Sequence, residues 1–146
     1  MIVTFPDMPP VDGPLKVPRP AVYLFGSYGA SRVNWQPHVA KKLDRYAGCV
    51  AYGGRAVADP LYVQWSVFWL RHCDLAVCWI DGDPWSQFEL GFSSARQTRM
   101  FVGAAEETVR VALEQALHAL GFSPVVYETT EQLVAAAREQ IGGERR

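Results

Sequence analysis

The stretch Leu75-Ala-Val-Cys-Trp-Ile80 is an unbroken run of apolar residues, which is typical of a strand buried on both faces of a parallel sheet. Asp81-Gly82 interrupts the run. Asp83 is a favoured helix N-cap, and Pro84 suits the first helical position because its missing N–H group needs no partner there. The sequence therefore predicts a strand, a tight turn and a helix. It also puts acidic side chains at the carboxyl end of the strand, where open α/β sheets bind their ligands.

The start of this helix carries three polar residues spaced three apart, which predicts that they line one face: Asp83, Ser86 and Glu89. We expect a different set of residues to face the sheet, namely Phe88, Phe92 and Ala95. Two interpretations of the polar face are open. It is either a solvated first turn, where the helix dipole favours acids, or one wall of a ligand site around Glu89.

The rest of the chain alternates short apolar segments with helical patterns. We expect five strands, at residues 21–25, 49–52, 75–80, 99–103 and 124–127. We expect helices at residues 36–47, 61–70, from 84 onward, 106–120 and 131 to about 141. This alternation predicts a single three-layer α/β domain, a five-stranded parallel sheet with helices on both faces. A flavodoxin-like (Rossmann-like) strand order, 2-1-3-4-5, places the loops after Phe25 and Ile80 side by side.

Residues 1–20 form a Pro-rich N-terminal arm that holds six of the ten prolines, so we expect extended chain rather than helix there. Within the arm, Ile2-Val3-Thr4-Phe5 is either a short edge strand or part of a loosely packed tail. The α/β domain then spans residues 21–142, and residues 143–146 are expected to fray.

The composition is that of a globular chain of 146 residues, 49% hydrophobic and 20% charged. Its net charge of -1 gives no general attraction to a nucleic acid polymer or an anionic membrane. Three cysteines without CxxC spacing argue for reduced core residues rather than disulfides or structural zinc: Cys49, Cys73 and Cys78. Because neither a signal peptide nor an 18-residue apolar span is present, we expect a cytoplasmic protein without a membrane partner.

A run of small residues, Gly26-Ser-Tyr-Gly-Ala-Ser31, follows the first strand of the domain, and Arg32 comes next. Backbone N–H groups in such a loop can approach an anion. We therefore consider Ser27, Ser31 and Arg32 as partners of a 5′-hydroxyl or a phosphate group. The alternative is a plain strand-to-helix turn.

The segment Leu61–Leu70 is apolar almost all round, which predicts a helix that is buried or lies at a subunit interface. Trp65 and Trp69 are four residues apart and share a face. Core packing is the favoured interpretation of these two rings, with a dimer seam and the wall of a base pocket as alternatives.

The stretch around Glu89 resembles the signature of the nucleoside 2-deoxyribosyltransferase family and its nucleotide N-glycosidase relatives. Asp83, Ser86, Glu89 and Gly91 stand at the family's aspartate, threonine, glutamate and glycine positions. Trp85 stands where the family has another glycine.

Two further segments carry this resemblance, which covers roughly residues 22–103. The segment Val22–Tyr28 is similar to the family's first strand and small-residue loop, and Gln64-Trp65 precedes Asp74 with a similar spacing. Some members have an acidic residue where this chain has Ser66. Asp59 is the candidate that would take the place of this acid.

The resemblance implies cleavage of the bond between a nucleobase and C1′ of 2-deoxyribose. It implies that Glu89 is the nucleophile, that Tyr23 orients it, and that Asp83 contacts the base or protonates it as it leaves. The substrate-binding set that it implies is Gly26, Ser27, Tyr28, Arg32, Asp59, Trp65, Asp81, Trp85 and Ser86.

No metal or organic cofactor is implied, and the expected partners are a small nucleoside or nucleotide and a free nucleobase. We expect a homo-oligomer, both from the apolar helix at residues 61–70 and from the family's habit of completing sites across subunits. Deoxyribosyl transfer is the favoured function. The alternatives are hydrolysis of nucleoside 5′-monophosphates, which Ser27, Ser31 and Arg32 favour, a non-catalytic nucleotide-binding module, and a structural α/β protein.

Overall fold

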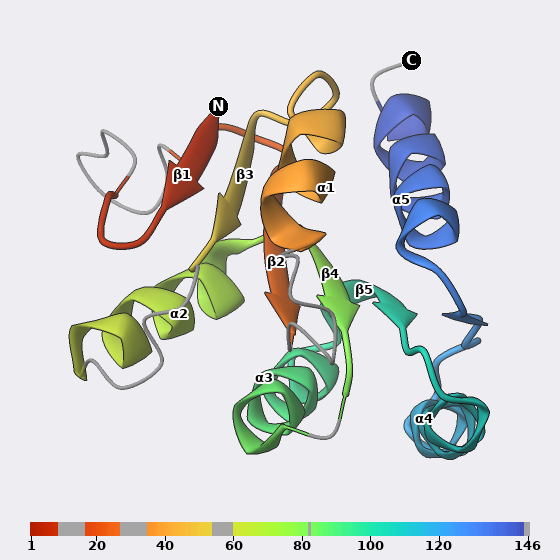
Figure 1. Ribbon diagram of the computed structural model, residues 1–146. Helices are drawn as coiled ribbons and strands as arrows, with labels where there is room; N and C mark the ends of the chain where they lie inside the picture. Colours follow the sequence, from red (N-terminus) through yellow and green to blue (C-terminus); the bar gives the residue numbers. More distant parts are fainter. Residues whose placement is uncertain (9–16, 27–34, 54–59, 82, 145–146) are drawn as a thin grey trace.

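The computed structural model describes residues 1–8, 17–26, 35–53, 60–81 and 83–144. Within these residues six strands form one parallel sheet in the order β1-β3-β2-β4-β5-β6 (Figure 1). The strands are β1 Ile2–Thr4, β2 Ala21–Gly26, β3 Cys49–Tyr52, β4 Leu75–Trp79, β5 Arg99–Gly103 and β6 Val126–Tyr127. The helices are α1 Trp35–Leu43, α2 Pro60–His72, α3 Pro84–Ala95, α4 Glu107–Ala119 and α5 Thr130–Glu144.

The α/β class and the parallel sheet are confirmed, but the predicted count of five strands is wrong. The five expected strands have the predicted order, since β3-β2-β4-β5-β6 reads 2-1-3-4-5. The sixth strand, β1, comes from the Pro-rich arm and pairs with β3. Val3 is buried there, and the amino group of Met1 forms an ion pair with Asp44 at 2.5 Å. Of the two interpretations of the arm's first residues, the edge strand is therefore right.

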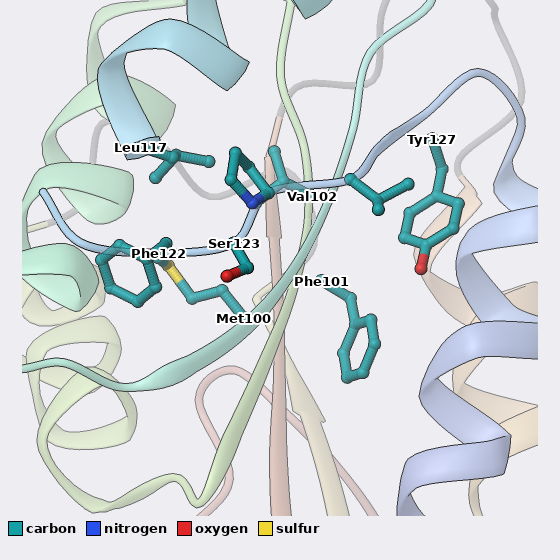
Figure 2. A pocket seen from close by; sticks show the side chains of 9 residues that line it. Met100, Phe101, Val102, Leu117, Phe122, Ser123 and Tyr127 are labelled. Atoms are coloured by element: carbon teal, nitrogen blue, oxygen red, sulfur yellow. The ribbon is translucent and has the colours of Figure 1, made fainter. Parts of the chain in front are cut away.

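At the opposite edge of the sheet, β6 covers only half of β5. Its two residues pair with Val102 and Gly103, so in the described chain the first half of β5 is paired with β4 on one side and has no strand on the other. A hollow of about 150 Å³ lies between β5, the end of α4 and the segment that leads into β6. Figure 2 shows its mainly apolar side chains, among them Met100, Leu117 and Phe122.

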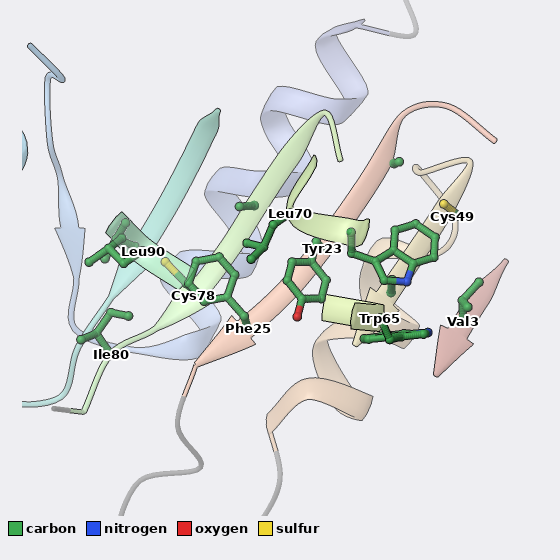
Figure 3. Packing of buried hydrophobic residues seen from close by; sticks show 14 of the residues in the cluster. Val3, Tyr23, Phe25, Cys49, Trp65, Leu70, Cys78, Ile80 and Leu90 are labelled. Atoms are coloured by element: carbon green, nitrogen blue, oxygen red, sulfur yellow. The ribbon is translucent and has the colours of Figure 1, made fainter. Parts of the chain in front are cut away.

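Each face of the sheet has its own core, because successive side chains of a strand point to opposite sides. Val22 and Leu24 of β2 pack with α1 and α5, whereas Tyr23 and Phe25 pack on the face covered by α2 and α3. Figure 3 shows Tyr23 and Phe25 in the second of these cores, together with Trp65.

The largest differences from the predicted helices are at the ends of α1 and α5. Helix α1 ends at Leu43 rather than at residue 47, and residues 44–46 form a turn whose amides bond back to Ala40 and Leu43. Helix α5 continues to Glu144 instead of ending near Ile141. The side chain of Ile141 is 1% exposed, so packing against the core holds the last turn that two following glycines would otherwise weaken.

All three cysteines are free thiols, with Cys49 and Cys78 buried and Cys73 half-buried. Burial raises the pKa of Cys49 to about 11 and that of Cys73 to about 12, which keeps both thiols protonated and unreactive. Among the helices that the structure describes, none is both long and apolar enough to cross a membrane.

Candidate active site

Helix α3 begins as the sequence predicts. The side chain of Asp83 caps it, accepting hydrogen bonds from the backbone N–H groups of Trp85 at 3.2 Å and Ser86 at 3.1 Å. The Ser86 hydroxyl also donates to Asp83 Oδ2, and Pro84 is the first helical residue. Both carboxylate oxygens of Asp83 therefore accept hydrogen bonds at the helix start, which fixes the direction of α3 and the residues that it turns toward the sheet.

The centre of the candidate site is a buried pair from two elements far apart in the sequence. The Tyr23 hydroxyl of β2 donates a hydrogen bond to Glu89 Oε2 of α3 over 2.8 Å. Tyr23 is 0% exposed and Glu89 is 1% exposed. The strand alternation that turns Tyr23 toward α3, and the cap that sets the register of α3, together bring these groups into contact. The interpretation of the polar face as a solvated first turn is therefore wrong for Glu89.

Burial dominates the electrostatics of the pair. It raises the pKa of Glu89 to about 8, against the lowering effect of the Tyr23 hydrogen bond and with a further raising effect from the charge of Asp83. Burial, and then the charge of Glu89, raises the pKa of Tyr23 well above its ordinary value. Glu89 therefore holds a proton at neutral pH in the free protein, and Tyr23 remains a hydrogen-bond donor.

The predicted orientation of the apolar residues on α3 is wrong. Phe88 is 47% exposed, Phe92 is half-buried and Ala95 is exposed. The stripe that faces the protein interior follows the helical spacing i, i+3, i+4 and i+7, and consists of Ser86, Glu89, Leu90, Ser93 and Ser94. Phe88 instead stacks on Trp85 outside this stripe, with ring centroids 5.0 Å apart.

Aromatic residues from α2 and the N-terminal arm surround Tyr23. The Trp65 ring lies edge-on to Tyr23 at 6.1 Å, and its indole N–H group donates to the Asp7 carbonyl over 2.8 Å. Trp65 is 5% exposed and Trp69 is 0% exposed. Core packing is thus the correct interpretation of these two rings. Trp65 and Trp69 do not form a dimer interface, because other residues of the same chain already bury both rings.

Tyr62 is a neighbour of the site that the sequence prediction missed. Its ring stacks on Trp65 and lies 6.5 Å from the ring of Trp85, so it joins α2 to the start of α3. A Cβ atom on Gly53 would lie 2.4 Å from the Tyr62 hydroxyl oxygen, so this ring also packs against the end of β3. The available signal was its position three residues before Trp65, on the same face of the helix.

The other sequence-predicted residues divide into three groups. Gly26 ends β2 with φ +129, and a Cβ there would lie 2.0 Å from the Trp79 carbonyl oxygen, so close strand packing requires glycine. Asp81 is exposed just after β4. The remaining four substrate-binding candidates lie outside the described residues: Ser27, Tyr28, Arg32 and Asp59. Ser31, which we considered with Ser27 and Arg32 as a partner of a phosphate group, lies outside them as well.

Two residues of the upstream match have structural roles. Asp74 accepts from the Ala21 backbone N–H at 2.7 Å and from Arg19 at 3.0 Å, at the amino ends of the strands. Ser66 is buried within α2 and donates to the Val63 carbonyl. Within the described parts of the chain, no group of three or more His, Cys, Asp or Glu side chains is placed to hold a metal ion.

A scan against models of known protein families finds no match to this chain, and a search of curated proteins finds no significant match.

Proposed function

We propose that this protein is an enzyme that cleaves the N-glycosidic bond of 2-deoxynucleosides and transfers the 2-deoxyribosyl group to another nucleobase, with Glu89 as the nucleophile. The observation that carries this proposal is the hydrogen bond of 2.8 Å between the Tyr23 hydroxyl and Glu89 Oε2 inside the core. A buried carboxyl group destabilises a fold unless something compensates for it, and groups with such perturbed pKa values gather at functional sites.

The chemistry needs an anion close to C1′. As the bond from C1′ to the base breaks, C1′ gains positive charge, which a carboxylate stabilises. A Glu89 oxygen then forms an ester bond to C1′, while the base leaves with the electron pair and takes up a proton. The incoming base displaces the ester, so that two inversions retain the configuration. In this scheme Tyr23 fixes the rotamer of Glu89, and Asp83 exchanges the proton with the base.

The raised pKa of Glu89 sets the pH range of this reaction. Only the ionised carboxylate is a nucleophile. With a pKa of about 8, Glu89 is ionised in only a minority of the free protein molecules at neutral pH. We therefore expect kcat/KM to rise about tenfold per pH unit below that pKa and to level off above it.

The test mixes the protein with 2′-deoxynucleosides and their 5′-monophosphates, with and without a free acceptor base, and follows the bases by chromatography. Glu89→Gln should lower the exchange rate at least ~10³-fold because the amide cannot form the ester. Glu107→Gln, the same change at an exposed position in α4, is the matched control and should keep full activity. If bases are released but not exchanged, the protein is a hydrolase rather than a transferase.

One observation favours a second function, a non-catalytic nucleotide-binding module. A carboxyl group that stays protonated at neutral pH acts as a hydrogen-bonding group rather than as a nucleophile. This alternative predicts no base release even at about pH 9, where Glu89 is ionised. It also predicts that Glu89→Gln leaves the affinity for deoxynucleoside monophosphates unchanged, as measured by calorimetry.

A further inference from the structure

A hollow of about 740 Å³ opens at the amino ends of β2, β4 and β5. This is the end of the sheet opposite to the loops that follow Phe25 and Ile80. Because α2 leads into β4 and α3 leads into β5, the last turns of both helices lie at this end as well. The side chains around the hollow are mainly polar, and they include Arg19, Asp74, Arg96, Gln97, Thr98 and Arg99.

Arg19 is held over the hollow by two contacts. Its Nη1 atom donates to the His72 carbonyl and, over 3.0 Å, to Asp74 Oδ1. Asp74 Oδ2 accepts from the Ala21 backbone N–H group over 2.7 Å, so both oxygens of this carboxylate are occupied. A guanidinium group carries five N–H donors. The donors on Nε and Nη2 of Arg19 therefore make no hydrogen bond to any residue in the described part of the chain.

Arg96 reaches the same end of α2 from the end of α3. Its Nη2 atom donates to the Arg71 carbonyl over 3.1 Å, next to the His72 carbonyl that Arg19 contacts. One nitrogen of each guanidinium group thus caps the end of α2, where the helix dipole favours cations. This capping role leaves their other donors unused. Among the described residues, neither Arg71 nor Arg96 forms an ion pair with a carboxylate.

The side chain of His72 shows that these positive charges act on one place. Partial burial, and then the charges of Arg19, Arg96 and Arg71, lower its pKa. The three arginines come from three different parts of the chain: the residues before β2, the end of α3 and the end of α2. On its other side the imidazole packs on the Phe68 ring, with ring centroids 4.6 Å apart. The end of α2 therefore carries an excess of positive charge.

We infer that this hollow binds a doubly charged phosphate group, either free phosphate or a phosphate monoester. The pair of Arg19 and Asp74 is neutral as a whole, so at least the charges of Arg71 and Arg96 are left for a ligand to match. Guanidinium groups bind phosphate oxygens through charge-assisted hydrogen bonds, often two at a time. Two such groups at one helix end suit a tetrahedral dianion better than a carboxylate, which has one charge and two oxygens. The inference is independent of the proposed function, because the hollow shares no residue with the pair of Tyr23 and Glu89.

The experiment follows the full-length protein by NMR at low ionic strength and about pH 7.5, where a phosphate monoester is doubly charged. Sodium phosphate, methyl phosphate and sodium acetate are added in separate titrations. The signal is the imidazole resonance of His72, identified by its loss in His72→Gln, so that phosphate bound elsewhere is not counted. We expect saturable shifts with phosphate, and a higher pKa of His72 in its presence, because the bound anion offsets the arginine charges. Acetate should bind at least about fivefold more weakly.

The decisive variant combines Arg71→Gln with Arg96→Gln, two exposed positions, and should weaken phosphate binding about fivefold or more. Lys41→Gln combined with Lys42→Gln is the matched control. It removes the same charge from exposed positions of α1, on the opposite face of the sheet, and should change the affinity less than about twofold. Arg71→Lys combined with Arg96→Lys keeps the charge but loses the planar donor pairs, so it should recover only part of the affinity.

The two phosphate ligands identify the source of the bound group. Equal binding of methyl phosphate and phosphate would assign the hollow to phosphate monoesters as well as to the free ion, and binding of phosphate alone would assign it to the free ion. The absence of a saturable shift of the His72 signal with phosphate would overturn the inference. Acetate binding as tight as phosphate binding, or equal losses in the arginine-to-glutamine and lysine-to-glutamine variants, would overturn it too.

Discussion

The two faces of the central sheet differ in the kinds of side chain that they bury. On the face covered by α1 and α5, the buried side chains of the described residues are apolar apart from Gln36, and several charged side chains of the two helices line a groove outside. On the other face, α3 alone contributes four buried polar side chains, one of them Glu89. Since both helix layers cover the same strands, the fold itself does not require a buried carboxyl group. Under the proposed function, the α3 face is therefore where stability is given up for chemistry.

The largest expected effect is the pH dependence of stability on the α3 face. Folding raises the pKa of Glu89 from 4.5 to about 8, chiefly through burial. Between these two pKa values the folded state keeps a proton that the unfolded state releases. The contribution of Glu89 to the free energy of unfolding is therefore fully present below the lower pKa and is lost as the pH rises through the upper one. The whole loss is on the order of 5 kcal/mol.

Denaturant unfolding of the wild type and Glu89→Gln from pH 5 to pH 8.5 measures this loss directly. The difference between the two free energies of unfolding should change steadily over that range in favour of the variant, because the amide does not titrate. Parallel profiles would mean that Glu89 has an ordinary pKa, and the contrast between the two faces would disappear.

The opposite face should respond to a loss of volume instead of to pH. Leu133 of α5 is 0% exposed, so Leu133→Ala is expected to lower the free energy of unfolding by about 2–5 kcal/mol, by the same amount at pH 5 and at pH 8.5. Leu120→Ala makes the same change at a side chain that is 60% exposed, and should lie within about 0.5 kcal/mol of the wild type. A marked pH dependence of the Leu133→Ala effect would contradict the division of the sheet into an apolar and an ionisable face.

The sequence predicts best what is decided locally. Asp83 and Pro84 start α3 at the predicted residue, because a cap depends on hydrogen bonds within one turn. The apolar runs of the inner strands also predict their positions, since a strand buried on both faces must be apolar throughout, and the alternation with helices predicts their order.

What the sequence fails to predict depends on contacts between distant segments. The pattern assigns Phe88 to the interior, yet a polar stripe that includes Ser86 and Glu89 faces the sheet, because Tyr23 is available there as a partner. The edge strand β1 depends on pairing with β3, far along the chain, so its own residues leave its structure undecided. The role of Tyr62 likewise appears only when α2, α3 and the end of β3 are brought together.

A smaller effect separates the two members of the buried pair. The hydrogen bond from Tyr23 lowers the pKa of Glu89, so Tyr23→Phe should raise that pKa further above about 8. The pH–rate profile of base exchange should then move to higher pH. The rate at neutral pH should fall about 3–10-fold, while the rate at high pH should change less. A uniform loss at every pH would mean that Tyr23 positions Glu89 without affecting its ionisation.

The smallest expected effect distinguishes the structural role of Asp83 from its proposed role with the base. Asp83→Ala removes a cap that accepts from the N–H groups of Trp85 and Ser86, and should cost about 0.5–2 kcal/mol in the free energy of unfolding. Asp83→Asn keeps an acceptor oxygen for the cap and should cost only a few tenths of a kcal/mol. It has no carboxyl proton to exchange, however, so a folded Asp83→Asn protein with a clearly reduced exchange rate would assign Asp83 to the reaction. If the asparagine variant is as active as the wild type and only the alanine variant is impaired, Asp83 acts on Glu89 through the helix start alone. The α3 face would then contain one reacting carboxyl group, held in place by a second one that belongs to the fold.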